Sequence, residues 1–281
     1  MAKEFGLDSP RLRPVVKPIR RGETSSPAAP EKPQKMKEAP LGEGKIKSGI
    51  MGFDELIGGG FEPRSINMVM GEAGTGKTTF VSQFLYNGAV QYGEPGVLLT
   101  FEESAESVKA HMAKYGFDFK KLEEQLLFQS INYRPHEVKK LVDEGGGLIL
   151  DTISSLGAKR LAIDSLTSYA MLFDSAYQAR EAQISLFEML RKWGCTSVIS
   201  AEGIPSSRKA KGAMGMEHLA DSVTVLYHAR HRSVRFRALE VIKYRGGKPA
   251  EKICPFEFVD GLGIRAYPDE EVFYDIKEKE E

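Results

Sequence analysis

Residues 71–78 read Gly-Glu-Ala-Gly-Thr-Gly-Lys-Thr, and this stretch decides the fold. Its spacing is that of a phosphate-binding P-loop, in which glycines let the backbone curl around phosphate oxygens without a Cβ in the way. The N–H groups of such a loop form an anion cradle at a helix N-terminus. Lys77 is expected to reach the β- and γ-phosphates of ATP, and the Thr78 hydroxyl to ligate Mg²⁺. The predicted nucleotide-binding residues are Gly71, Glu72, Ala73, Gly74, Thr75, Gly76, Lys77, Thr78 and Thr79.

The flanking sequence supports a true P-loop over a chance match. Residues 65–70 form a short apolar run of strand type. After the loop, apolar residues recur at helical spacing until Gly88, at Phe80, Val81, Phe84 and Leu85. Strand, loop and helix thus follow one another in the order that phosphate binding requires.

Composition limits the remaining possibilities. The chain has 281 residues, 41% of them apolar, and a formal net charge of zero, so any nucleic-acid or membrane site must be local. Cys195 and Cys254 lie in apolar runs and are interpreted as buried, reduced thiols. No stretch is long and apolar enough for a membrane span, and the start lacks the apolar core of a secretory signal. A cytoplasmic protein without a membrane partner is expected.

The composition changes near residue 44. Residues 1–44 hold seven of the chain's 14 prolines and nine Lys or Arg against six Asp or Glu. Such a segment buries too little apolar surface to offset its ordering entropy, so we expect a flexible, mildly basic tail, either inert or a binding arm. Residues 269–281 are expected to form a charged C-terminal tail, which leaves 45–268 as one nucleotide-binding domain.

Strand-like and helix-like patterns alternate through this domain. Strands are predicted at 65–70, 97–101, 126–130, 160–164, 196–201, 221–228, 234–243 and 255–260. Helices are predicted at 77–91, 104–115, 118–125, 136–143, 148–156 and 175–193. The alternation predicts an α/β fold with a mainly parallel sheet flanked by helices. The successive strands of the last third predict antiparallel additions at one edge.

Hydrolysis needs a metal carboxylate, and Asp164 is the candidate. It ends the apolar strand 160–164, and the carboxyl ends of parallel strands face the ligand crevice of an open sheet. There it would bind Mg²⁺ beside Thr78, directly or through water. The alternative is an acid that only caps the segment that follows.

Hydrolysis also needs a group that orients or deprotonates water. Glu102 and Glu103 end the next strand after the P-loop helix, where a carboxylate can face the γ-phosphate. We favour Glu102 as the base and Glu103 as its support, while either acid could instead cap the helix that starts near Ser104. Ser200, at the end of another strand, could sense the γ-phosphate.

With these residues in place, the chain resembles the KaiC-like branch of the RecA superfamily of ATPases over residues 46–265. The resemblance rests on Gly-Phe-Asp-Glu-Leu-Ile-Gly-Gly-Gly at 52–60, on Leu-Leu-Thr-Phe-Glu-Glu at 98–103 and on Ile-Asp-Ser-Leu-Thr at 163–167. Residues 217–226 and 237–246 are similar to the closing strands of that family. The resemblance implies a RecA-like fold, ATPase activity and assembly into hexameric rings with ATP between neighbouring subunits.

The resemblance also implies that Lys243 and Arg245 reach the adjacent subunit's site. Residues two apart on a strand share one face, and two cations there suit a γ-phosphate, although a solvated strand face is the plainer explanation. The family's founding clock protein carries a phosphorylated Ser-Thr pair in its second domain. Glu217 and His218 stand at the matching positions, so self-phosphorylation there is not expected.

Two basic stretches leave a nucleic-acid function open. Residues 203–215 carry Arg208, Lys209 and Lys211 without an acid, and residues 228–237 form a second basic stretch between late strands. Such stretches can track phosphates, but basic loops are most often solvated surface. The alternatives to a self-contained ATPase are therefore an ATP-gated binding module and a DNA-repair accessory. A small-molecule kinase fits less well, because no inserted lid segment is visible.

Overall fold

The computed structural model describes residues 44–101, 103–133, 137, 146–203, 216–231 and 234–270. Several sequence predictions fall outside these ranges. They are the tail of residues 1–44 apart from Gly44, most of the helix at 136–143, the basic loop 203–215 apart from Gly203, the candidate base Glu102, and most of the tail 269–281.

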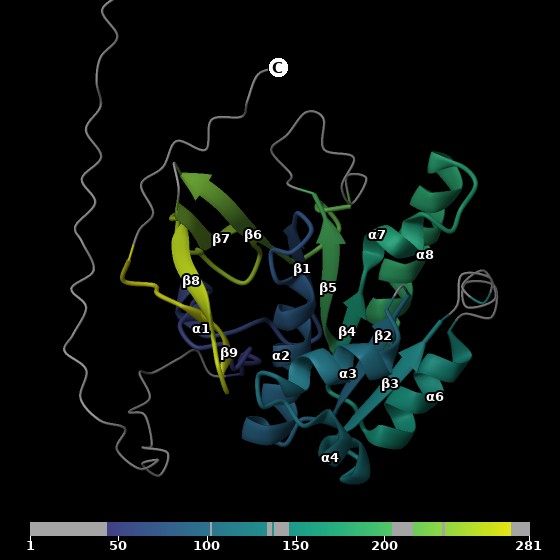
Figure 1. Ribbon diagram of the computed structural model, residues 1–281. Helices are drawn as coiled ribbons and strands as arrows, with labels where there is room; N and C mark the ends of the chain where they lie inside the picture. Colours follow the sequence, from purple (N-terminus) through teal and green to yellow (C-terminus); the bar gives the residue numbers. More distant parts are fainter. Residues whose placement is uncertain are drawn as a thin grey trace, which may run out of the picture. The chain divides into compact units, whose positions relative to one another are not determined.

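The described residues build a mixed sheet with helices on both faces (Figure 1). Its strand order is β3-β2-β4-β5-β1-β6-β7-β8-β9. Pairing is parallel from β3 through β6 and antiparallel from β6 through β9. The strands are β1 (Ile66–Gly71), β2 (Gly96–Thr100), β3 (Phe128–Asn132), β4 (Arg160–Asp164), β5 (Thr196–Glu202), β6 (Ser222–His231), β7 (Val234–Tyr244), β8 (Cys254–Val259) and β9 (Gly263–Ala266).

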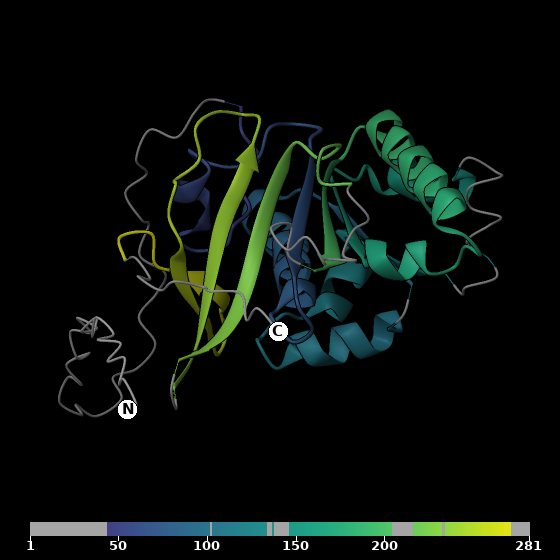
Figure 2. The same ribbon diagram turned by 90° about the horizontal axis from the view of Figure 1, so that it is seen from above.

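The helices cover the two faces of the sheet, as the views in Figures 1 and 2 show. One apolar core packs α1 to α4 and the strands β8 and β9 against the sheet, and the other packs α6 to α8 against the opposite face. No helix in the described ranges has the length and apolar character needed to cross a bilayer. The helices are α1 (Phe53–Leu56), α2 (Lys77–Tyr92), α3 (Ala105–Ala113), α4 (Phe119–Glu124), α6 (Gly147–Leu156), α7 (Leu166–Ala170) and α8 (Ala176–Trp193).

Burial on both faces explains why the parallel strands are continuous apolar runs. In β1, Met68 and Met70 face the core under α8, whereas Val69 faces the core under α2. The α/β architecture with an antiparallel edge is therefore confirmed. The structure differs from the prediction in one pairing and in three short elements. β6 runs parallel to β1, so antiparallel pairing begins only at β7, and the four-residue strand β9, the four-residue helix α1 and the five-residue helix α7 are not among the predicted elements.

A buried arginine links segments that the sequence pattern leaves unconnected. Arg160 starts β4 and is 1% exposed. Its guanidinium donates to the Phe84 carbonyl and to the Lys47 carbonyl at 2.8 Å each, and its Nε donates to Glu94 Oε2 at 2.7 Å. The sequence predicts this strand only as an apolar run that ends in an acid. The guanidinium instead connects the segment before α1, the helix α2 and the sheet.

We expect Arg160→Leu to lower the free energy of unfolding by about 3–5 kcal/mol, because it leaves Glu94 and two buried carbonyls without their partner. Urea unfolding followed by circular dichroism measures this change. Glu94→Gln is the matched control and should cost less, since an amide oxygen can still accept from the guanidinium. A loss below about 1 kcal/mol for Arg160→Leu would show that the network contributes little net stability.

Candidate nucleotide-binding site

The P-loop lies between the carboxyl end of β1 and the first turn of α2. Two of its glycines are required by close packing: a Cβ on Gly71 would approach the Leu226 carbonyl oxygen to 2.5 Å, and one on Gly76 would approach the Phe258 ring to 2.6 Å. Gly74 is required for a different reason, because its φ of 75° is in the left-handed region that side chains disfavour. The predicted strand, loop and helix are thus present in the expected order.

Lys77 is the first residue of α2, and its side chain is held against the P-loop by backbone carbonyls. Its ammonium donates to the carbonyl oxygens of Gly71 and Glu72 at 2.9 Å each, and the residue is 9% exposed. A cation fixed beside a cradle of N–H groups is suited to binding the terminal phosphates of a nucleotide.

Asp164 meets the P-loop as the sequence predicted. Its Oδ2 accepts a 2.7 Å hydrogen bond from Thr78 Oγ1, and its Oδ1 accepts one from Ser200 Oγ. The two partners come from the start of α2 and from the end of β5, on either side of the carboxyl end of β4. Ser200 therefore orients the acid, which is a contact that the sequence reading did not foresee.

This arrangement suits a hard divalent cation. Burial raises the pKa of the Asp164 carboxyl, while the hydrogen bonds from Ser200 and Thr78 and the charge of Lys77 act in the opposite direction. A cation would offset the cost of the buried negative charge. Hydroxyl and carboxylate oxygens are the ligand types that Mg²⁺ takes together with nucleotide phosphates. Thr78 and Asp164 thus fit Mg²⁺, which would neutralise charge on the phosphates.

Glu103 also lies near this site but is engaged by the following helix. Its Oε1 accepts from Ser107 Oγ at 2.5 Å and lies 2.9 Å from His111 Nδ1. The Ser104 side chain caps α3 by accepting from the Ser107 N–H. The negative charge of Glu103 also acts on Asp164 and adds to the rise in the pKa of the Asp164 carboxyl. These contacts tie Glu103 to α3, and Glu102 lies outside the described residues.

Lys243 and Arg245 lie away from the P-loop of their own chain. Lys243 pairs with Val223 near the start of β6, at the end of the sheet where β1 begins. Its ammonium donates to the carbonyls of Glu217, His218 and Ala220 at 2.6–3.0 Å. The side chain of Arg245 donates to the His218 carbonyl at 3.0 Å and is 55% exposed.

Two residues at the P-loop escaped the sequence reading. Arg237 Nη1 donates to the carbonyls of Gly74 and Thr75 at 2.9 and 3.1 Å, and its guanidinium lies 4.7 Å from the centre of the Phe258 ring. Phe258 in turn packs against Gly76. Burial lowers the pKa of Arg237. Nothing in the spacing of residues more than 160 positions apart signals this contact, and the sequence predicts Arg237 only as part of a basic hairpin.

The strands that carry these two residues are fastened to the P-loop helix. The Gln83 amide, on α2, donates to the carbonyls of Leu262 and Ile264 and accepts from the Ile264 N–H at 2.6 Å. The β8–β9 hairpin thus has a set position relative to the phosphate cradle.

A P-loop whose threonine is hydrogen-bonded to an acid at the end of a neighbouring parallel strand defines a nucleotide-binding protein of the P-loop class. The model of the KaiC ATPase family matches residues 46–271, and the chain belongs to this family. Membership supports an ATP-binding protein of RecA type and suggests ATPase activity.

Individual proteins agree with that assignment. A UPF0273 protein of Methanocaldococcus jannaschii is 31% identical, over 80% of this chain and 97% of that protein. The circadian clock oscillator protein KaiC of Synechococcus elongatus is 31% identical over 80% of this chain but only 44% of its own length. A solved KaiC-like protein from Pyrococcus horikoshii has a TM-score of 0.72 and 35% identity, covering 80% of this chain and 99% of its own.

Proposed function

We propose that this protein is a Mg²⁺-dependent ATP hydrolase that works as a ring with ATP bound between neighbouring subunits. The observation that carries the proposal is the Thr78–Asp164–Ser200 contact beside Lys77, which brings together a phosphate-binding cation and an oxygen site for Mg²⁺. When bound, the metal supplies charge neutralisation at the phosphates. In this proposal the protein's own residues bind the nucleotide and orient the attacking water.

Glu102 is the proposed base for the attacking water, with Glu103 as its support. The proposal rests on strand order: β2 is the neighbour of β4 in the sheet, so the residues that follow β2 come at the same edge of the sheet as Asp164, where a base for the attacking water is needed. Glu103 is engaged by Ser107 and His111, which suits a residue that orients the end of the strand.

Arg245, with Lys243, is proposed to complete the neighbouring subunit's site. Both residues lie at the opposite end of β1 from their own P-loop, which favours action in trans over action in cis. The half-exposed Arg245 suits this role better than Lys243, whose ammonium already serves three carbonyls of its own chain. Each site then has Lys77 but lacks the second cation, Arg245, until a neighbour arrives, so turnover should be slow and should require assembly.

We expect Glu102→Gln to lower the rate of ATP hydrolysis about 100-fold while leaving ATP affinity within about twofold, because it removes only the base. Glu103→Gln is the matched control and should cost about tenfold. Steady-state phosphate release and nucleotide binding are measured on both variants. Wild-type rates from both variants would remove the acid pair from the mechanism.

The same variant separates this proposal from an ATP-gated binding module. In such a module the functional event is nucleotide binding, so Glu102→Gln would keep or strengthen partner binding.

A nucleic-acid role has one favouring observation: in the β6–β7 hairpin, Arg230 pairs in register with Arg235, and His228 with Arg237. Measuring whether the protein associates with single-stranded DNA in a salt-dependent way tests that role. The cytoplasmic location stays a prediction from the sequence.

A further inference from the structure

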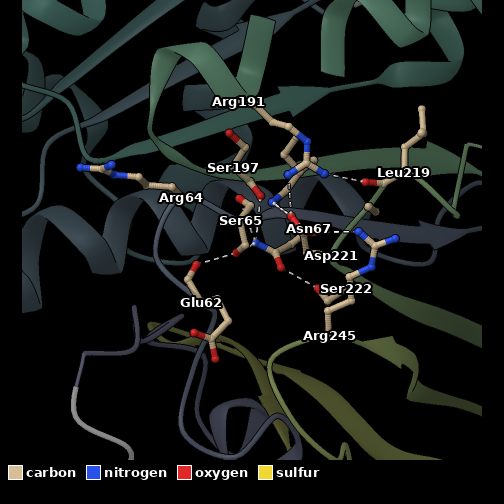
Figure 3. Close-up of polar contacts among 12 residues, drawn as sticks. Glu62, Arg64, Ser65, Asn67, Arg191, Ser197, Leu219, Asp221, Ser222 and Arg245 are labelled. Atoms are coloured by element: carbon tan, nitrogen blue, oxygen red, sulfur yellow. Dashed lines mark hydrogen bonds and ion pairs between the residues drawn. The ribbon is translucent and has the colours of Figure 1, made fainter. Parts of the chain in front are cut away.

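Asp221 joins three elements at the end of the sheet where β1 begins (Figure 3). Its Oδ2 accepts a 2.9 Å hydrogen bond from the N–H of Ile66, and its own N–H donates to the Ile66 carbonyl at 2.7 Å. Its carbonyl accepts from the N–H of Arg245 at 2.8 Å. The residue therefore fastens the end of β7 to the first residue of the strand that leads into the P-loop.

The Asp221 carboxylate also lies between two arginine side chains. Arg245 Nη1 lies 3.3 Å from Oδ1, and Arg191 Nη1, from the last turn of α8, lies 3.5 Å from Oδ2. The acid is 18% exposed, whereas the two arginines are about half exposed. Without the carboxylate, two like charges would face each other across this point.

The polar side chains next to Asp221, at the start of β1 and β6, are buried and hydrogen-bonded. The Asn67 amide donates to Ser65 Oγ at 2.9 Å and to the Ser197 carbonyl at 3.1 Å, and its oxygen accepts from Ser222 Oγ at 2.7 Å (Figure 3). These residues tie β1 to β5 on one side and to β6 on the other. A satisfied polar network of this kind holds neighbouring groups in one arrangement.

Asp221 and the His218 carbonyl thus hold the Arg245 side chain at the end of β1 opposite the P-loop of its own chain. A long arginine side chain that is half exposed loses its rotamer freedom only when partners hold it. Its side-chain partners in the described part of the chain are Asp221 and the His218 carbonyl. From Ile66 to Gly71 the strand β1 spans about 17 Å of buried backbone, so the Arg245 anchor and the P-loop are opposite ends of one stiff element.

We propose that Asp221 is a positioning residue that holds Arg245 in the orientation required by the neighbouring subunit's ATP site. This inference rests on the proposed function, because it assumes that Arg245 acts in trans. It goes further than that function in two ways: Asp221 orients the Arg245 guanidinium, and the strand β1 connects the Asp221 anchor to the P-loop. A cation misplaced by an ångström loses much of its effect on the rate.

The test is a double-mutant cycle on the full chain with ATP and Mg²⁺. Asp221→Asn keeps an acceptor for the Ile66 N–H but removes the charge that pairs with Arg245. We expect kcat to fall about tenfold, with ATP affinity and particle mass unchanged. In an Arg245→Gln background the same change should alter kcat less than about twofold, because the residue through which it acts is already absent.

Arg191→Gln is the matched control, since it removes the other arginine from the same carboxylate and leaves Arg245 paired. It should leave kcat within about twofold of the wild type. If Asp221→Asn does not fold, Asp221→Glu serves instead, because it keeps the charge but moves it by one methylene group; it should also lower kcat only when Arg245 is present.

The outcomes separate the two proposals. If Arg245→Gln lowers kcat and neither Asp221 variant does, the positioning role is wrong and the trans role stands. If Asp221→Asn lowers kcat equally with and without Arg245, its effect is a general structural one and the inference is overturned. If Arg245→Gln leaves kcat unchanged, the trans role and the positioning role both fall.

Discussion

Mixing two inactive variants, Lys77→Ala and Arg245→Gln, is expected to restore ATP hydrolysis that neither shows alone. Lys77→Ala loses the cation that is held over the P-loop, so its own site should lose phosphate binding. Arg245→Gln keeps an intact P-loop but presents no arginine to its neighbour. Each variant alone should be slowed about 100-fold or more, since a cation supplied in trans to a γ-phosphate has effects of that size.

The restored activity follows from the two ends of β1. Arg245 is anchored where the strand begins and the P-loop lies where it ends, so in the proposed ring a head-to-tail contact would bring one subunit's arginine to the next subunit's nucleotide. In rings assembled from equal amounts, about a quarter of the interfaces combine an intact P-loop with an intact arginine. Hydrolysis should therefore recover to about a quarter of the wild-type rate.

The measurement is phosphate release at several mixing ratios after subunit exchange, with particle mass followed by light scattering. A control mixture replaces Lys77→Ala with the double variant Lys77→Ala/Arg245→Gln, which offers neither half of a site and should restore nothing. Mixed particles that form without any gain in rate would count against action in trans. Full activity of a strict monomer would do the same.

Asp164→Asn is expected to abolish stabilisation by Mg²⁺-ATP while leaving the free protein as stable as the wild type or more so. The carboxylate is buried beside Thr78 and Ser200, and burial raises its pKa, so its charge is a cost to the free fold. An amide of the same shape removes that charge and still has groups for both hydroxyls. It no longer provides the charged carboxylate oxygen through which proteins commonly bind Mg²⁺ beside nucleotide phosphates.

Thermal unfolding with and without Mg²⁺-ATP measures both effects. Nucleotide at 100 times its dissociation constant should stabilise the wild type by about 2.7 kcal/mol, and this gain should largely disappear in Asp164→Asn. Hydrolysis should fall about 100-fold or more. Ser200→Ala is the control, because it removes one hydrogen bond to Asp164 but no charge, and it should keep most of the nucleotide-dependent gain. An undiminished gain in Asp164→Asn would place the metal elsewhere.

Local patterns in the sequence were enough to predict most of the architecture. The P-loop, the strand ending in Asp164 and the long helices α2 and α8 are each specified within some 20 consecutive residues, by glycine spacing or by hydrophobic period. Placing Asp164 beside Thr78 needed only the rule that the carboxyl ends of parallel strands meet at one edge of a sheet.

Contacts between distant segments could not be predicted in the same way. The sequence predicts Arg160 only as part of an apolar strand, yet its guanidinium connects Lys47, Phe84 and Glu94. The sequence predicts Arg237 as part of a basic hairpin, yet its guanidinium donates to carbonyls of the P-loop. In both cases the side chain's partners depend on strand order and register, which neither composition nor spacing specifies.

The sequence by itself determined that this is a nucleotide-binding α/β protein. The phosphate cradle is specified by the spacing of its glycines and the buried strands by runs of apolar residues, and both are local patterns. Only the tertiary structure decided which side chains surround that cradle and where the late cations lie. It placed Arg237 and Phe258 against the P-loop and anchored Arg245 at the far end of β1 through Asp221. The physical reason is that hydrogen bonds and close packing act over a few ångströms in space, whatever the distance between the partners along the chain.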